Sequence, residues 1–184
     1  VITPEPSVIV GLYQNGTWRF RDGVDANAPE LTFTFGLNEA GWSPVVGDWN
    51  GDGTDDLGLY KDGLWIVRDT SLTDTFVQFG EAGSLPVVGD WNSDGFTDLA
   101  TFNNGVWSLR DSVSQSVTTV NFGSTLANAL PAAGDWDNDG TDTISLYQNG
   151  QWFVYDGSNA EPISAVATFG TDDTSWLPIN GDWN

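Results

Sequence analysis

The sequence predicts an all-β protein, and specifically a four-bladed β-propeller. A Gly-Asp-Trp motif recurs four times, and its aspartates, Asp48, Asp90, Asp135 and Asp182, stand 42 to 47 residues apart. Each unit holds short apolar runs of strand length that are separated by Gly, Asn and Asp. No segment shows the 3.6-residue periodicity of an amphipathic helix. A β-solenoid is the alternative repeat architecture, but it would need capping repeats, and none is visible.

The strands of a unit follow in a fixed order. The first is the apolar run before the acidic loop, as in "PVVGDW" at 44–49, and "TFVQFG" at 75–80 makes the fourth by its period-2 alternation. The second and third flank a two-residue turn of Asn-Gly or Asp-Gly, which tolerates the positive φ angles of a type I′ hairpin. These turns are Asn15-Gly16, Asp62-Gly63, Asn104-Gly105 and Asn149-Gly150.

The two ends of the chain complement each other. The N-terminal unit lacks a first strand, and the C-terminus supplies such a strand with nothing after it. Pairing them would close the ring and leave no free sheet edge. The alternative is that blades of separate chains combine into a larger ring, and we expect a monomer. The predicted single domain spans 1–184, with blades at 44–80, 86–123, 131–170, and 178–184 plus 7–36; residues 1–6 read as a linker remnant.

Composition excludes several functions. The chain has no Cys and no His, which rules out thiolate metal sites and His-dependent catalytic triads. Its 26 Asp and Glu against 5 Lys and Arg give a net charge of −21, which opposes binding to nucleic acid. No apolar stretch reaches the ~20 residues of a membrane span, so we expect no membrane insertion. The start on Val, with no signal peptide, indicates a mature or excised segment.

Acidic residues cluster in the loops after the first strands. Counted from the first Asp of each loop, acids or Asn occupy positions 1, 3 and 5, and Gly occupies position 6. Oxygen ligands at alternating positions around a sharp turn suit Ca²⁺ better than Mg²⁺. Asp, Asn and Gly are also ordinary turn residues, but three such loops favour calcium. The candidate ligands are Asp48, Asn50, Asp52, the Thr54 carbonyl and Asp56 in the first loop, and Asp90, Asn92, Asp94, the Phe96 carbonyl and Asp98 in the second.

The loop pattern DxNxDGxxD, with a Phe-Gly pair and a proline in each unit, resembles the FG-GAP/VCBS-type repeats of integrin α-subunit propellers and many bacterial secreted proteins. The resemblance covers nearly the whole chain. In that family the loop joins the first two strands of a blade and holds Ca²⁺ through positions 1, 3, 5, the carbonyl of 7, and 9. The resemblance therefore implies calcium at the residues named above.

The third loop departs from this pattern. Asp135, Asp137, Asp139 and the Thr141 carbonyl fit, but position 9 is Thr143, and Asp142 at position 8 is not expected to be a ligand. Either a water molecule takes the place of the last carboxylate ligand in this loop, or the loop binds calcium more weakly. The fourth copy offers only Asp182 and Asn184 at positions 1 and 3, with Glu5 aligned to position 5 across the break in the chain. The sequence thus predicts about three calcium sites.

Tryptophans also recur, and packing between blades is the favoured interpretation of them. A stacking platform for sugars is the alternative. Trp42 and Trp176 lie outside the repeat and are the candidates for ligand contact. Eight repeat positions carry Trp: Trp18, Trp49, Trp65, Trp91, Trp107, Trp136, Trp152 and Trp183.

These patterns predict a non-catalytic, calcium-binding propeller module of a secreted or cell-surface protein, which binds a protein or glycan partner in adhesion or acts as a stabilised spacer. One alternative is a carbohydrate-binding lectin. The other is a hydrolase that uses paired Asp carboxylates. Nearly every Asp belongs to the repeat, whereas catalysis usually breaks internal symmetry at one site, so we expect no enzyme.

Overall fold

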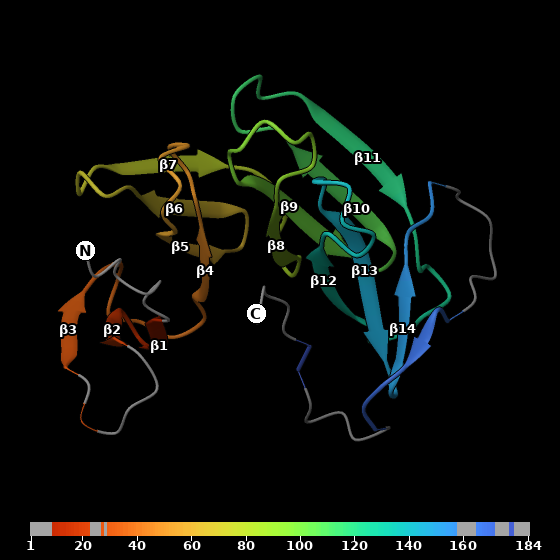
Figure 1. Cartoon of the computed structure of the whole chain (residues 1–184), viewed down its shortest axis with the longest axis horizontal. Coiled ribbons are helices and arrows are strands. Elements are labelled where there is room, and N and C mark those ends of the chain that lie inside the picture. Colours follow the sequence, from red (N-terminus) through yellow and green to blue (C-terminus); the bar gives the residue numbers. More distant parts are fainter. Residues whose placement is uncertain (1–8, 23–26, 28, 158–164, 172–176, 179–184) are drawn as a thin grey trace, which may run out of the picture. The chain divides into compact units, whose positions relative to one another are not determined.

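The computed structural model of the chain describes residues 9–22, 27, 29–157, 165–171 and 177–178. In this part of the chain all regular structure is β-strand, and the strands form four antiparallel sheets (Figure 1). These sheets are the blades of a four-bladed β-propeller, so the fold class predicted from the sequence is confirmed. The described residues include no helix long and apolar enough to cross a membrane.

The chain divides into two compact units, Val1–Pro44 and Val45–Asn184. The first holds the sheet β1-β2-β3, made of β1 (Ile9–Gln14), β2 (Thr17–Asp22) and β3 (Glu30–Thr34). This three-stranded sheet occupies the described part of the predicted N-terminal unit at 7–36. The predicted closing strand at 178–184 and the linker at 1–6 lie outside the described residues, except for Pro178, so ring closure stays a prediction.

The three complete blades follow in chain order, and β4 begins at the boundary between the two units. Each blade pairs its strands in sequence, first to fourth. The first complete blade is β4 (Ser43–Gly47), β5 (Asp56–Lys61), β6 (Leu64–Arg68) and β7 (Asp74–Gln78). The second is β8 (Leu85–Gly89), β9 (Asp98–Asn103), β10 (Val106–Arg110) and β11 (Val117–Asn121). The third is β12 (Leu130–Gly134), β13 (Thr143–Gln148), β14 (Gln151–Val154) and β15 (Ala167–Thr168).

The hairpin between the second and third strand of each blade has the predicted type I′ turn. Both central residues have positive φ in all four copies, for example 50° at Asp62 and 86° at Gly63. Asn, Asp and Gly tolerate this conformation, and its twist matches that of the paired strands. The sequence prediction of these four turns is confirmed.

A tryptophan just after each turn joins the third strand to the end of the fourth. The indole N–H donates to the carbonyl of the Phe in the Phe-Gly pair at 2.9–3.2 Å, and the N–H of that Phe donates to the turn Gly at 2.8–2.9 Å. Trp65 and Trp107 are fully buried. These tryptophans are therefore packing residues, as expected. The four Trp and Phe pairs are Trp18 and Phe35, Trp65 and Phe79, Trp107 and Phe122, and Trp152 and Phe169.

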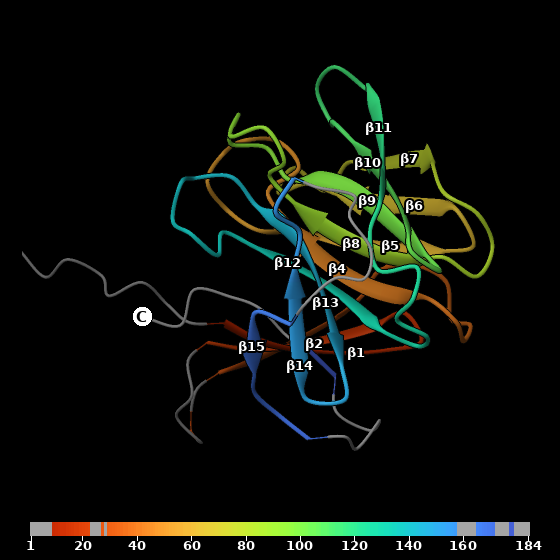
Figure 2. The same cartoon turned by 90° about the vertical axis from the view of Figure 1, so that its right-hand side faces the viewer.

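Neighbouring blades share an apolar core within the second unit. The second and third complete blades bury one cluster that includes Phe102, Trp107, Leu146 and Phe153. Their first strands, β8 and β12, lie side by side (Figure 2). A Cβ placed on Gly123 would stand 2.0 Å from the Leu146 side chain of the next blade, so the glycine of this Phe-Gly pair permits the close approach.

Candidate metal centres

The three acidic loops connect the first and second strands of the three complete blades. They span 48–56, 90–98 and 135–143, and we call them loop 1, loop 2 and loop 3. Position 9 of each loop is the first residue of the strand that follows, β5, β9 or β13. The positions that the sequence proposes as ligands therefore belong to one short loop in each blade.

The three loops share one hydrogen-bond scaffold. In loop 1 the Asp48 carboxylate accepts the N–H of Asp52 at 3.1 Å and that of Gly53 at 2.7 Å. Asn50 Oδ1 accepts the N–H of Asp52, and Asp52 Oδ1 accepts the N–H of Thr54, both at 2.9 Å. Loop 2 repeats all four bonds, and loop 3 repeats the two to its first Asp and the one from position 7. These bonds hold the side-chain oxygens at positions 1, 3 and 5 of loops 1 and 2, and at positions 1 and 5 of loop 3, against backbone N–H groups of the same loop.

Two positions in each loop have positive φ. At position 6 the values are 83° for Gly53, 83° for Gly95 and 88° for Gly140, as the repeated glycine predicts. At position 4, Gly51, Ser93 and Asn138 also have positive φ, from 58° to 72°. The sequence analysis missed position 4, although its small or turn-forming residues are a visible signal.

Position 9 in loops 1 and 2 carries a buried carboxylate with an uncompensated oxygen. Asp56 is 4% exposed and Asp98 is 0% exposed. Asp98 Oδ1 accepts the N–H of Ser112 at 2.6 Å, but the Oδ2 atoms of both residues have no hydrogen-bond partner in the described part of the chain. An unpaired buried carboxylate oxygen is strongly unfavourable, so these two loops fit a bound cation.

Electrostatics lead to the same conclusion. Burial, reinforced by the neighbouring carboxylates of which Asp52 contributes most, raises the pKa of Asp56 to about 6. Burial is also the main cause of the raised pKa of Asp98. Both shifts mean that the protein groups around position 9 do not offset the cost of burying its negative charge.

Loop 3 brings three carboxylates together at the surface. Oxygens of Asp135, Asp137 and Asp139 lie within 4.8 Å of one another, and all three residues are exposed. Thr143 supplies no carboxylate at position 9. Loop 3 thus has the most acidic set at positions 1, 3 and 5, but it lacks the buried charge of the other two loops.

Asp142 serves a different purpose from ligation. Its Oδ2 accepts the N–H of Asp90 at 2.8 Å, and its own N–H donates to the Asp90 carbonyl at 2.9 Å. Thr97 makes the same pair of bonds with Asp48, through Oγ1 at 2.9 Å and its N–H at 2.8 Å. Position 8 of loops 2 and 3 therefore fastens each of these loops to position 1 of the preceding one. The sequence analysis missed these contacts, because they join residues about 50 positions apart.

Residues after the third strand also approach the loops. Thr70 Oγ1 donates to Asp52 Oδ2 at 3.0 Å, and Asn92 Nδ2 donates to Asp111 Oδ2 at 3.0 Å. Asp69 and Asp111, which the sequence places in repeated Arg-Asp pairs, accept backbone N–H groups of the turns that follow them, as at Thr73 and Ser114. Asp69 therefore stabilises a hydrogen-bonded bend next to loop 1, and Asp111 stabilises one next to loop 2.

Of the two tryptophans that the sequence proposes for ligand contact, only Trp42 lies in the described part of the chain. Trp42 is 8% exposed, and its indole N–H donates to Glu39 at 3.0 Å, so its ring offers no stacking surface. Trp176 lies outside the described residues. Trp49 and Trp136 donate from their indole N–H groups to the Leu57 and Thr143 carbonyls, at 3.1 and 2.9 Å, which ties position 2 to the next strand.

The fold and these loops define a class of protein, a β-propeller with one acidic, turn-stabilised loop in each complete blade. Comparison of the chain with family models, with curated proteins and with solved structures found no match. The interpretation of the site therefore rests on its own geometry.

Proposed function

We propose that this chain is a calcium-binding, non-catalytic propeller module of a secreted or cell-surface protein, of the kind that FG-GAP/VCBS-type repeats form. The observation that carries the proposal is the pair of buried Oδ2 atoms of Asp56 and Asp98, which lack any donor among the described residues. Each stands at the position where the loop pattern requires its last ligand. A cation is the natural partner for such an oxygen in a loop that is already acidic.

The ions would be held by oxygens at positions 1, 3, 5, 7 and 9 of each loop. In loop 2 these would be the carboxylates of Asp90, Asp94 and Asp98, the Asn92 side-chain oxygen and the Phe96 carbonyl. Asn92 Oδ1 accepts one N–H and keeps a second lone pair, so ligation does not require that bond to break. The ion would supply positive charge and would perform no chemical step. Loop 3 would bind more weakly because it lacks a position-9 carboxylate.

The position of the loops indicates what calcium would do. Successive loops are joined through the bonds of Thr97 to Asp48 and of Asp142 to Asp90, so each ion would stiffen a joint between two blades. A chain of net charge −21 also gains from neutralisation of its densest acidic clusters. Calcium would thus make the module a rigid platform or spacer at the millimolar calcium level for which extracellular modules are tuned.

Thermal unfolding in calcium and in EDTA tests the proposal. At a free calcium concentration about 100 times Kd, each site adds about 2.7 kcal/mol, so two sites add about 5 kcal/mol. For a domain of this size that corresponds to a rise in Tm of roughly 10–20 °C. Magnesium at the same concentration should give much less, because it resists loss of its water shell. An identical Tm in calcium and in EDTA would refute the calcium assignment.

A further inference from the structure

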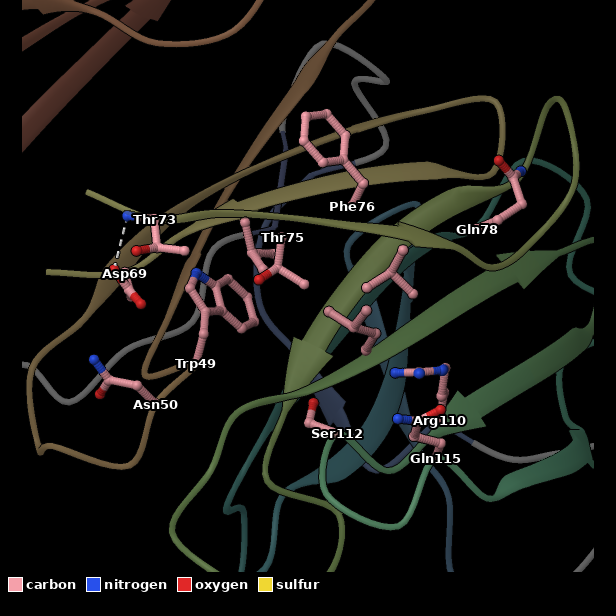
Figure 3. Close-up of a pocket in the computed structure, with 13 residues that line it drawn as sticks. Trp49, Asn50, Asp69, Thr73, Thr75, Phe76, Gln78, Arg110, Ser112 and Gln115 are labelled. Atoms are coloured by element: carbon pink, nitrogen blue, oxygen red, sulfur yellow. Dashed lines mark hydrogen bonds between the residues drawn. The ribbon is translucent and has the colours of Figure 1, made fainter. Parts of the chain in front are cut away.

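A pocket lies between the first and second complete blades, inside the second unit of the chain. Its volume is about 450 Å³, within the range of about 300–1,000 Å³ typical of small-ligand sites. One side is formed by Trp49, Asn50, Asp69 and Thr73, and the other by Arg110, Ser112 and Gln115 (Figure 3). The lining combines one cation, Arg110, and on the opposite side one carboxylate, Asp69, with neutral hydroxyl and amide groups and with aromatic rings.

Arg110 stands out because its blade has lost the partner that the equivalent arginines have. Arg21 pairs in register with Glu30, and the two side chains form an ion pair. Arg68 pairs in register with Asp74 and binds it through two hydrogen bonds of 2.6 and 2.8 Å. Arg110 faces Val117 at that register, and its side chain has no hydrogen bond or ion pair with any described residue.

Phe76 breaks the repeat in the same pocket. It is 65% exposed, whereas the equivalent register positions of two other blades hold Thr32 and Thr119. In Figure 3 the Phe76 ring projects from β7 to the side opposite Thr75 and Trp49, so it stands at the rim of the pocket. There its exposed face can stack against the C–H groups of a sugar ring. Two departures from the repeat therefore occur at one pocket, Arg110 in its lining and Phe76 at its rim, which is the pattern expected of a ligand site rather than of the scaffold.

We propose that this pocket binds a carboxylated sugar, a hexuronate unit of a glycan, with the carboxylate on Arg110 and the ring against the aromatic side of the pocket. The guanidinium group matches a carboxylate through two parallel hydrogen bonds. Thr75 and Gln115 offer the hydroxyl and amide groups that sugar hydroxyls need, and Gln78, whose Nε2 donates to the Gly63 carbonyl, keeps its Oε1 as an acceptor. An acidic peptide would satisfy Arg110 equally, but it would leave these neutral groups and the exposed Phe76 ring without matching partners.

This inference goes beyond the calcium role and rests on it in one respect: Trp49 and Asn50 belong to loop 1, so calcium should help to fix that side of the pocket. The acidic surface opposes any anionic ligand at long range. Filling of loop 1 would reduce that repulsion beside the pocket. Binding of the glycan unit should therefore be tighter in calcium than in EDTA.

Calorimetric titration of the calcium-loaded chain with methyl glucuronide, and with methyl glucoside as the uncharged counterpart, tests the proposal. We expect the glucuronide to bind at least tenfold more tightly than the glucoside. Arg110→Gln should remove that preference, and Phe76→Thr should weaken both sugars. Arg68→Gln is the matched control, since that arginine is already paired with Asp74, and it should leave binding unchanged.

Val117→Glu provides a second variant that keeps Arg110 in place. It restores the cross-strand carboxylate found opposite Arg21 and Arg68, so it should pair Arg110 and abolish glucuronide binding without lowering the Tm. Equal affinities for the two sugars, or glucuronide binding that survives both Arg110→Gln and Val117→Glu, would overturn the proposal. So would Arg110-dependent binding of a glutamate-rich peptide without binding of the glucuronide. Glucuronide binding with no effect of calcium on Tm would support the pocket and refute the calcium role alone.

Discussion

Substitution of Asp98 by Asn separates a metal ligand from an ordinary buried hydrogen-bonding residue. Asp98 is fully buried, its Oδ1 accepts the Ser112 N–H at 2.6 Å, and its Oδ2 has no partner among the described residues. Asn has the same shape and keeps an oxygen for Ser112, but it removes the charge. The variant should therefore gain less stability from calcium than the wild type does.

The size of each effect follows from the site. In EDTA the substitution relieves an uncompensated buried charge and should stabilise the fold by about 1–3 kcal/mol. In calcium, a 100-fold loss of affinity at loop 2 should cost up to about 2.7 kcal/mol, or roughly 5–11 °C in Tm. Relief of the buried charge acts in both conditions, so the variant should melt above the wild type in EDTA. The rise in Tm from EDTA to calcium should be smaller for the variant than for the wild type by roughly 5–11 °C.

Thermal melts of both proteins, each in calcium and in EDTA, measure this difference. Asp62→Asn is the matched control, because it removes one carboxylate at a hairpin position where the other three blades already have Asn. It should shift Tm equally in both conditions. Equal destabilisation of Asp98→Asn in calcium and in EDTA would show that Asp98 acts only through Ser112, and would refute the reasoning.

Three further substitutions test the fold around the loops. Thr97→Val removes the acceptor for the Asp48 N–H and should lower the free energy of unfolding by about 1–3 kcal/mol in calcium and in EDTA alike. Chemical denaturation that shows no loss would mean that this bond between the loops does not stabilise the fold. Asn104→Ala forces φ of 48° on a residue that disfavours it and should cost about 1–2 kcal/mol, read as a lower denaturation midpoint. Trp107→Phe loses the indole bond to Phe122 and leaves space in a fully buried site, so we expect a cost of about 2–4 kcal/mol, and a midpoint within error of wild type would contradict the packing role.

The repeats made much of the fold predictable. The Asn-Gly and Asp-Gly dipeptides predicted four hairpins whose φ angles agree, and the Asp residues at 48, 90 and 135 predicted where the loops lie. Such features are local, because a two-residue turn or a nine-residue loop depends on the nearby sequence. Burial of Asp56 and Asp98 was not visible in the sequence, since it depends on the strands that cover position 9.

Contacts between distant residues were harder to foresee. Position 8 could be counted along each loop, but its bond to the preceding loop depends on how adjacent blades pack. The isolation of Arg110 was hidden for a similar reason. The acidic partner follows its arginine by 9 residues in one blade and 6 in the next, so spacing alone does not show that Val117 occupies that register.

Direct titration of the metal-free chain with calcium tests the central claim most closely. The loops predict about three bound ions for each chain, with loops 1 and 2 filled first because each supplies a buried carboxylate at position 9. Magnesium should compete poorly for these sites. A calorimetric stoichiometry near three, falling by one in Asp98→Asn, is the result that we predict. Absence of saturable calcium binding at millimolar concentration would contradict the account.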